Sequence, residues 1–482
     1  MLHRSLIVVL ICSSVAFALS GSAHPAPSGR FSLGAFTSYA TGATPESYEI
    51  ADLNADGKPD VVTANLDGKS VSILLNSAHG RFAPRHDYRL GGGAKSVVVA
   101  KLDENTTPDL VVLREGAAFS VLLNRGDGSF AVGQTAGFTP TVLSAADLNG
   151  DRRADVVTRH DDVVSVFINR GDGTFLPNRD YQVVGDDPQG LVVADLTGDH
   201  RPDIGTTYYT NVTVLLNDGH GSFGRMRRYK TPAQILVAKD LNRDGALDLV
   251  TADNPEDAMG AAFVLLNRGH GRFRTPRRYA IGTNLGTWTV ADLNGDSAPD
   301  LIGQYEARVA IEFNRGNGIF QRRRDYATPW FFHFTVADVN GGSPDLVFAS
   351  WDLGRVGVLL NRGHGKFGAL LQYRTLDGPD TVRVADLNGD RSGDVLTLSN
   401  DTDGGGNRIS VLLSKRGKCD VQDVFKKTLG SARATLMRGG CTLGRVTWGH
   451  SRVPPGRVMG QRPKFGAVLR GGSSVDIVVS RG

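Results

Sequence analysis

The chain has little of what several common classes of protein depend on. Only 3 of its 482 residues are cysteine, and aromatic residues make up 7%. Its one long apolar run, from Leu6 to Leu19, is shorter than the ~20 residues that a membrane-spanning helix needs. There is no G-X-Y period, and β-branched residues and leucine are plentiful. A membrane span, a collagen triple helix and wholesale disorder are therefore excluded.

Catalytic motifs are absent as well. The sequence contains no HExxH, no G-x-S-x-G and no P-loop. Its histidines outside the turns are scattered, and we expect surface or packing roles for His86, His160, His200, His333 and His450. The sequence thus favours a protein without catalytic activity.

The first residues, 1–23, have the features of a secretory signal. Arg4 precedes the apolar run, and small residues follow it, so cleavage is expected after Ala18 or Ala23. With Cys12 removed in the signal, Cys419 and Cys441 remain. In an oxidising compartment such a pair is most simply a disulfide, which contributes roughly 3 kcal/mol. We therefore expect a secreted protein, for which nucleic acid is a disfavoured partner.

What the chain has in excess is glycine, with 60 residues, and much of it recurs in a repeat. Eight segments align at spacings of 45–52 residues, a period typical of propeller blades. They begin at Asp52, Lys101, Asp147, Asp195, Asp240, Asp292, Asp338 and Asp386.

Each unit carries the signals of four short strands. An alternating apolar stretch is followed by an acidic loop, a Pro-Asp-Val-Val-like run, a Val-x-Val-Leu-Leu-Asn run and then Gly-x-Gly-x-Phe, which leads to a stretch ending near tyrosine. Four such strands make one blade. The histidines between the paired glycines, His220, His270 and His364, are expected to serve turn geometry.

The two ends of the repeat are complementary. Residues 29–39 form a Gly-x-Phe strand without an acidic loop, whereas the last unit stops at Leu413 without a Gly-x-Phe strand. The N-terminal strand is therefore expected to complete the final blade and remove the open edges. We expect an all-β propeller over residues 24–414, with eight blades favoured and seven as the alternative.

The acidic loops match the spacing of a calcium-binding loop. Side-chain oxygens stand at positions 1, 3, 5 and 9, and a backbone carbonyl at position 7 adds another donor; Ca²⁺ takes six to eight oxygens at roughly 2.3–2.6 Å. The expected ligands are Asp52, Asn54, Asp56, Lys58 and Asp60; Asp147, Asn149, Asp151, Arg153 and Asp155; Asp195, Thr197, Asp199, Arg201 and Asp203; Asp240, Asn242, Asp244, Ala246 and Asp248; Asp292, Asn294, Asp296, Ala298 and Asp300; and Asp386, Asn388, Asp390, Ser392 and Asp394.

Two of the eight loops depart from this spacing. The second begins with Lys101, and the seventh, from Asp338 to Asp345, is one residue shorter. We therefore expect five to six Ca²⁺ sites; the alternative is that the aspartates only cap turns.

These motifs resemble FG-GAP/VCBS repeats, as in the N-terminal propeller of integrin α-subunits. The resemblance covers roughly residues 29–414 and implies a propeller with Ca²⁺ loops. Propellers of the integrin type have seven blades, so a count of eight departs from them. Some relatives with such repeats are polysaccharide lyases, and an enzyme acting on an acidic polysaccharide is accordingly the alternative function.

Residues 415–482 differ in composition, with 14 Lys and Arg against 3 acidic residues. A helix is expected after Thr428, with Leu429, Ala432, Leu436 and Met437 on its apolar face, and strands are expected over 443–448, 457–461 and 475–480. The segment resembles a PASTA domain, except that Gln422 and Phe465 stand where that family usually has proline. The resemblance implies association with the cell wall and possible binding of peptidoglycan fragments.

Two further groups of residues are candidates for ligand binding. Aromatic residues gather at 329–333, with Trp351, Tyr208 and Tyr209 elsewhere, and are expected mainly to pack between blades. Arginine clusters at 227–228, 277–278 and 322–324 are expected in the last strands of their blades, as guards of the sheet edges or as anion sites. The expected protein is a monomeric, secreted Ca²⁺-binding propeller that binds a glycan or protein ligand at the cell wall.

Overall fold

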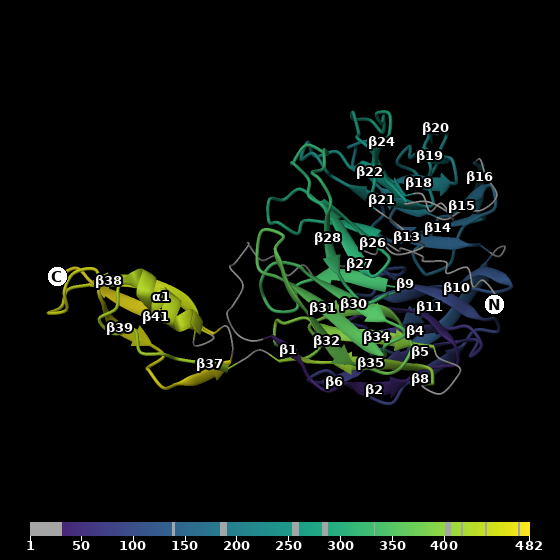
Figure 1. Cartoon of the computed structure of the whole chain (residues 1–482). Helices are drawn as coiled ribbons and strands as arrows, with labels where there is room; N and C mark the ends of the chain where they lie inside the picture. Colours follow the sequence, from purple (N-terminus) through teal and green to yellow (C-terminus); the bar gives the residue numbers. More distant parts are fainter. Residues whose placement is uncertain are drawn as a thin grey trace.

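The computed structural model describes residues 31–136, 140–183, 190–252, 260–281, 288–331, 333–400, 406–415, 418–438, 441–470 and 473–482. Within these ranges the chain is almost entirely β-structure, with the single helix α1 (Leu429–Arg438) (Figure 1). The signal predicted for residues 1–23 lies outside the described part. No helix of the described part is both long enough and apolar enough to span a bilayer.

Eight antiparallel sheets of four strands, here sheets 1 to 8, account for most of the described residues. Sheet 1 consists of β3 (Pro45–Ala51), β4 (Asp60–Asn65), β5 (Ser70–Leu74) and β8 (His86–Arg89), and the short pair β6 (Asn76–Ala78) and β7 (Arg81–Phe82) precedes β8. Sheet 2 consists of β9 (Ala94–Ala100), β10 (Asp109–Arg114), β11 (Ala117–Asn124) and β12 (Phe130–Ala136). Sheet 3 consists of β13 (Val142–Ala146), β14 (Asp155–His160), β15 (Val163–Phe167) and β16 (Arg179–Gln182).

The next three sheets repeat the same order. Sheet 4 consists of β17 (Leu191–Ala194), β18 (Asp203–Tyr208), β19 (Asn211–Leu216) and β20 (Arg225–Lys230). Sheet 5 consists of β21 (Ile235–Lys239), β22 (Asp248–Ala252), β23 (Ala262–Leu265) and β24 (Arg277–Tyr279). Sheet 6 consists of β25 (Trp288–Ala291), β26 (Asp300–Tyr305), β27 (Arg308–Glu312) and β28 (Arg324–Ala327).

The last two sheets bring the chain back to its beginning. Sheet 7 consists of β29 (His333–Ala337), β30 (Asp345–Ser350), β31 (Arg355–Asn361) and β32 (Phe367–Arg374). Sheet 8 takes β33 (Pro379–Ala385), β34 (Asp394–Ser399) and β35 (Arg408–Leu412) from the end of the repeat and β2 (Thr37–Ala40) from its start. Next to it, β1 (Ser32–Leu33) pairs with β36 (Ser414–Lys415).

Burial follows the order of strands within each sheet. The second strands are buried on both faces, as in β4 and β30, which explains why they read as continuous apolar runs. The fourth strands are largely exposed, as in β16 and β28. Within the repeat, each hydrophobic cluster joins side chains of two consecutive sheets; one, for example, contains Val62 of sheet 1 and Val97 of sheet 2. Such repeated four-stranded sheets, packed face to face, are consistent with a β-propeller.

The strand that the sequence predicts from Gly29 to Tyr39 does join the end of the repeat. β2 pairs antiparallel with β35, with Thr37 opposite Val411. Sheet 1 also packs on sheet 8, because Tyr48 and Val61 share a hydrophobic cluster with Leu396. The first and last sheets are therefore in direct contact.

An ion pair crosses the contact between sheets 1 and 8. Nη2 of Arg383 lies 2.7 Å from Oε1 of Glu49, and the Arg383 guanidinium stands 5.3 Å from the centre of the Tyr48 ring. Glu49 is buried, with 7% of its surface exposed. Burial raises the pKa of Glu49, and the charge of Arg383 opposes this rise. A carboxyl whose pKa is raised in the folded state favours folding when protonated.

Removing the arginine is therefore expected to cost more than removing the carboxylate. Arg383→Gln leaves a buried charge without a partner and should lower the free energy of unfolding by about 2 kcal/mol at pH 7. Glu49→Gln removes that charge and should cost less. Urea denaturation at pH 7 and pH 5 measures both, and the Arg383→Gln defect should be smaller at the lower pH, because the raised pKa of Glu49 favours its neutral form as the pH falls. Equal losses for the two variants at both pH values would contradict this account.

The C-terminal residues form a separate small core. α1 packs Ala432 and Leu436 against Ile477 and Val479 of a three-stranded sheet, in the order β38 (Thr442–Gly449), β41 (Ser474–Ser480), β39 (Val458–Arg462). The predicted helix start is confirmed, since the Ser431 amide donates to Oγ1 of Thr428 at 3.3 Å. All three predicted strands are present as well.

In this part of the chain, the structure contains one pair of strands that the sequence does not predict, and it leaves one predicted disulfide pairing untested. β37 (Lys418–Asp420) pairs with β40 (Val468–Arg470), and neither strand was predicted. Cys441 is buried and disulfide-bonded. The side chain of Cys419, its expected partner, lies outside the described part, as does Gly439-Gly440, so the Cys419–Cys441 pairing stays a prediction.

Candidate metal sites

The six intact acidic loops share a backbone conformation that the other two lack. Each loop joins the first strand of its sheet to the second, and the residues at positions 4 and 6 both have positive φ. These residues are Ala55 and Gly57, Gly150 and Arg152, Gly198 and His200, Arg243 and Gly245, Gly295 and Ser297, and Gly389 and Arg391. One residue of each pair is not glycine, and left-handed backbone costs such a residue roughly 1 kcal/mol or more.

Carboxylates at positions 1 and 5 hold this conformation. In the first loop Oδ2 of Asp52 accepts the Gly57 amide at 2.8 Å, and Oδ1 of Asp56 accepts the Lys58 amide at 2.9 Å. The equivalent bonds recur in the other five loops, with Asp147, Asp195, Asp240, Asp292 and Asp386 at position 1. At position 5 they are made by Asp151, Asp199, Asp244, Asp296 and Asp390. The amides of the position-7 residues, whose carbonyls the sequence predicts as ligands, are thus fixed to the loop.

The aspartate at position 9 has a second role that the sequence analysis missed. Asp60 is fully buried, and its two oxygens accept the Leu53 amide at 2.9 Å and the Asn76 amide at 2.7 Å. The same pair of bonds occurs in all eight units, including the second loop at Asp109 and the seventh at Asp345. The position-9 aspartate is therefore part of the blade framework, whether or not its loop is intact.

Negative charge crowds around the position-9 carboxyls. Burial, together with the carboxylates of Asp56 and Asp52, raises the pKa of Asp60 to about 6. The same causes raise the pKa of Asp155, Asp203 and Asp248 to about 6 and that of Asp300 to about 7. Burial and Asp390 raise the pKa of Asp394 to about 7. The carboxylates within a loop are thus near enough to repel one another, which a bound cation would relieve.

The donor set also contains oxygens without partners. Oδ1 of Asn388, at position 3 of the sixth intact loop, is buried and accepts no hydrogen bond; in the seventh loop the same is true of Oδ1 of Asn340. A buried amide oxygen without a donor is costly, and a hard cation satisfies it.

The loops nevertheless are not a ready-made metal cluster. Among the described residues, no three His, Cys, Asp or Glu side chains come together closely enough to hold a metal ion as they stand. The carboxylates instead accept amides. In the first loop, each oxygen of Asp52 accepts one amide and keeps a second lone pair. The residues fit Ca²⁺ by chemistry and spacing, with Asn and backbone oxygens completing the set.

Asparagines at the ends of the third strands, or just beyond them, link one sheet to the next. Nδ2 of Asn124 donates to the Leu53 carbonyl of the preceding sheet at 2.7 Å and to the Pro108 carbonyl of its own loop at 2.9 Å. Seven of the eight units make this contact, and the residues are Asn76, Asn124, Asn169, Asn217, Asn267, Asn314 and Asn361. Asn76 reaches the Leu387 carbonyl at 2.8 Å and so joins sheet 1 to sheet 8.

The turn histidines divide into two groups. His270 and His364 have positive φ, as their place between two glycines predicts, whereas His220 is not among the residues with positive φ. Of the other candidates, His333 is partly exposed at its surface, yet desolvation lowers its pKa to about 4, with Arg383 acting in the same direction. A histidine that stays neutral in a packed seam fits the packing role expected for it.

The aromatic candidates for ligand binding differ in their exposure to solvent. Phe331 is buried in the cluster that joins sheets 6 and 7, as predicted, but Trp330 and Trp351 are each 45% exposed. Phe332 lies outside the described part. The arginine clusters at 227–228 and 277–278 lie in the outer strands β20 and β24, as the sequence predicts. Of the third cluster, Arg324 begins β28, whereas Arg322 and Arg323 precede the strand.

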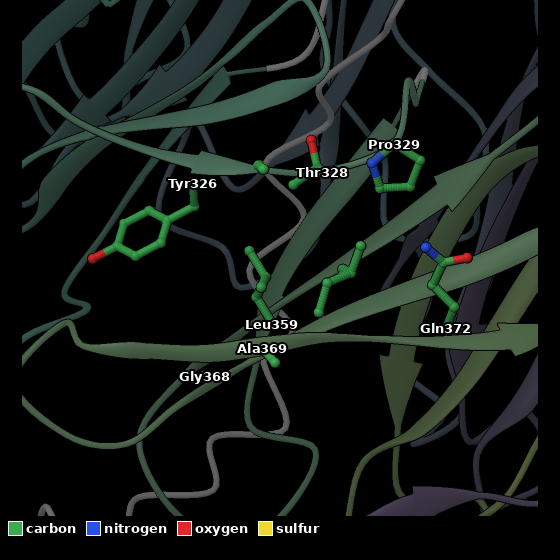
Figure 2. Close-up of a pocket in the computed structure, with 9 residues that line it drawn as sticks. Tyr326, Thr328, Pro329, Leu359, Gly368, Ala369 and Gln372 are labelled. Carbon is green, nitrogen blue, oxygen red and sulfur yellow. The ribbon is translucent and has the colours of Figure 1, made fainter.

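A hollow of about 540 Å³ lies beside these aromatic residues, between β28 and β32. In Figure 2, Tyr326 stands on one side of it and Gln372 on the other, with Leu359 between them. Tyr326 donates to the Gly365 carbonyl at 3.2 Å. No carboxylate, histidine, lysine or arginine is among the nine lining residues, and Tyr326 is the one among them with a titratable side chain.

Comparison with known proteins identifies the repeat but not a close relative. No curated protein matches the sequence. One similar solved structure is that of an Agrocybe aegerita lectin that recognises non-reducing terminal N-acetylglucosamine, at 20% identity over 67% of this chain and 93% of the other, with a TM-score of 0.46. Another is BBS1N in complex with ARL6DN, at 12% identity over 78% and 93%, with a TM-score of 0.44. Such TM-scores establish neither a shared fold nor a shared ligand.

The family description FG-GAP-like repeat matches residues 52–112, 101–158, 147–206 and 240–302. These ranges contain five of the six intact acidic loops and the degenerate second loop. They also contain the Val-x-Val-Leu-Leu-Asn runs whose asparagines join the sheets. Residues 52–206 and 240–302 of the chain therefore contain FG-GAP-like repeats.

Proposed function

We propose that this chain is a secreted, non-catalytic β-propeller of eight blades, stabilised by Ca²⁺, that binds a glycan or a protein. Residues 415–482 serve as a PASTA-like domain that holds the propeller at the bacterial cell wall. The observation that carries the proposal is the division of the acidic loops into six and two.

The division of the loops supports calcium binding because the series of oxygen donors in the sequence and the left-handed residues in the backbone separate the same six loops from the same two. The loops with a complete or near-complete donor series have left-handed residues at positions 4 and 6, whereas the loop from Lys101 has no positive φ and the loop from Asp338 has one, at Gly341. The position-9 aspartate is present in both groups. What distinguishes the six is therefore the tip of the loop, where positions 1, 3, 5 and 7 would hold the ion.

Bound Ca²⁺ would supply a positive charge that cross-links the tip to the blade. In each of the six loops, oxygens at positions 1, 3, 5, 7 and 9 would bind it, as Asp386, Asn388, Asp390, Ser392 and Asp394 illustrate. The orphan oxygen of Asn388 and the mutual repulsion of the carboxylates support this assignment. The function of the ion is structural, since the loops hold no separate acid or base aimed at a substrate.

Eight blades in a closed ring are supported by the contacts at the seam. β2 completes sheet 8, Asn76 bonds to Leu387, and Arg383 pairs with Glu49. Since sheets 1 and 8 are thus joined by backbone, amide and charge, we propose that no blade is missing between them. A ring without open edges suits a protein outside the cell, where unpaired edges invite aggregation.

The C-terminal residues offer surfaces for a wall polymer. Phe465 is 66% exposed and Trp448 is 50% exposed in a segment with a formal charge of +11. Exposed aromatic rings stack on sugars, and basic side chains attract anionic polymers. Retention of the full chain on purified cell wall should fall severalfold for Trp448→Ala with Phe465→Ala. Tyr209→Ala, at 45% exposure in sheet 4, should leave it unchanged. Equal retention of all three proteins would remove the anchoring role.

A glycan array with the Ca²⁺-loaded full chain tests the propeller. Binding to one class of glycan without release of product supports a binding protein. Release of unsaturated or shortened oligosaccharides from any wall or plant polysaccharide would instead establish the lyase-like enzyme, and absence of any glycan or protein ligand would refute the binding role.

A further inference from the structure

A row of arginines runs across the outer strands of four consecutive sheets. Arg179 stands opposite Val166, Arg227 opposite Val214, Arg277 opposite Val264, and Arg324 opposite Ile311. These are the same register position in sheets 3, 4, 5 and 6. Sheets 4 and 5 add a second arginine at the next position, Arg228 and Arg278, and both are exposed. β20 and β24 lie at the edge of the molecule in Figure 1.

The charge is concentrated on sheets 4 to 6. We use the name arginine belt for Arg225, Arg227, Arg228, Arg272, Arg274, Arg277, Arg278, Arg322 and Arg324. None of these side chains forms an ion pair within the described part of the chain. The belt therefore presents positive charge that the protein itself does not neutralise.

Protection of a sheet edge does not explain this concentration. Residues 268–279 of sheet 5 contain 5 arginines and no acidic residue. The equivalent residues 125–136 of sheet 2 contain 1 arginine and 1 aspartate, and residues 170–182 of sheet 3 contain 2 of each. Sheets 2 and 3 expose the same kind of edge with balanced charge, so the fold does not require the excess.

Several belt arginines are held in place by contacts with their own or the next sheet. Nη1 of Arg227 donates to the His270 carbonyl in the next turn. The Arg277 guanidinium lies 5.4 Å from the centre of the Tyr279 ring, and that of Arg324 lies 4.9 Å from the Phe313 ring. A guanidinium has five N–H donors, and one such contact leaves most of them for a carboxylate or sulfate. Arginine side chains that such contacts already hold in one conformation lose less entropy on binding a ligand than mobile ones do.

We propose that the arginine belt binds an anionic polysaccharide, with carboxylate or sulfate groups of successive sugars meeting the arginines of successive sheets. This rests on the proposed glycan-binding function and names the class of glycan. A polymer with a repeating unit matches this row, because each successive sheet carries an arginine at the same register position. Nucleic acid fits less well, because binding of single strands relies on exposed aromatic platforms, and Tyr279 in the belt is only 8% exposed.

The test compares two double variants of the full chain in Ca²⁺. Arg228→Ala with Arg278→Ala removes two exposed belt charges, and Arg89→Ala with Arg125→Ala removes two exposed charges from sheets 1 and 2. Affinity for polygalacturonate and heparin is measured by titration at several salt concentrations. The belt variant should bind at least about tenfold more weakly, with a shallower salt dependence, and the control should change less than about twofold. The basic C-terminal segment is the same in all three proteins, so its contribution cancels.

Three outcomes would overturn the inference. These are equal losses in the two variants, no affinity for either polyanion, and binding of a single-stranded oligonucleotide as tight as that of polygalacturonate. If the array still shows a neutral glycan ligand when polyanions fail, only the belt is refuted. If no glycan of any charge binds, the proposed function fails with it. Circular dichroism spectra and unfolding temperatures of both variants confirm that each is folded.

Discussion

Chelation of Ca²⁺ is expected to lower the unfolding temperature of the full chain by more than about 10 °C. One ion bound at a hundredfold excess over its Kd contributes about 2.7 kcal/mol. Even half of that at six loops exceeds the whole stability of many domains, and in proteins of 150–250 residues 1 kcal/mol shifts the unfolding temperature by about 2–4 °C. Scanning calorimetry with Ca²⁺, with EGTA, and with EGTA followed by excess Ca²⁺ measures the loss and its recovery.

Titration calorimetry gives the number of sites and locates them. The metal-free chain should bind five to six Ca²⁺ ions. Asp390→Asn, in the loop with the orphan Asn388 oxygen, should remove one of them, whereas Asp103→Asn in the degenerate second loop should not change the count. Mg²⁺ should substitute poorly, because it demands a tighter octahedral shell. A chain that gives no heat with Ca²⁺ and unfolds at the same temperature in EGTA would leave the aspartates as turn caps.

The strands of the repeat could be predicted in detail because most of their determinants are local. The alternation at Tyr48 and Ile50 and the run at Val61–Val62 each mark a strand within a few residues. The N-terminal strand could also be assigned to sheet 8, because a Gly-x-Phe strand was missing at one end of the repeat and left over at the other. The antiparallel pairing of β2 with β35 agrees with that assignment, and the structure adds its register, with Thr37 opposite Val411.

The interactions between sheets could be predicted much less well. Asn76 and Leu387 stand 311 positions apart, and nothing in either residue's neighbourhood indicates the other. The asparagine that ends each Val-x-Val-Leu-Leu-Asn run was visible in the repeat, yet its role was not. Recurrence at the end of a buried strand was the available signal, because a buried amide must find partners. The same reasoning applies to the position-9 aspartate. The sequence predicts it as a metal ligand, and in the structure it also accepts two backbone amides, one from its own loop and one that follows the third strand.

The asparagine contacts are expected to be among the largest single contributions to stability. Asn314 is 1% exposed, and its Nδ2 donates to the Leu241 carbonyl at 2.8 Å and the Pro299 carbonyl at 3.0 Å. Its Oδ1 accepts the Gly316 amide at 2.9 Å. Asn314→Ala leaves these buried groups without partners and opens a gap between sheets 5 and 6. The free energy of unfolding should fall by about 3 kcal/mol, measured by urea denaturation in saturating Ca²⁺.

A neighbour in the same sheet provides the control. Asn317 lies in the exposed turn, where its Oδ1 accepts the Ile319 amide at 3.1 Å, so Asn317→Ala should cost about 0.5 kcal/mol. Sheet 8 provides the reverse change, because Ser414 stands there in place of asparagine, and its amide donates to Asp394 as the asparagine amides do in the other units. Ser414→Asn should give the Val339 carbonyl of sheet 7 the donor that the other seven units have, and raise stability by about 1 kcal/mol. If Asn314→Ala costs no more than Asn317→Ala, the sheets are held together by apolar packing, and the recurrent asparagines only complete their own loops.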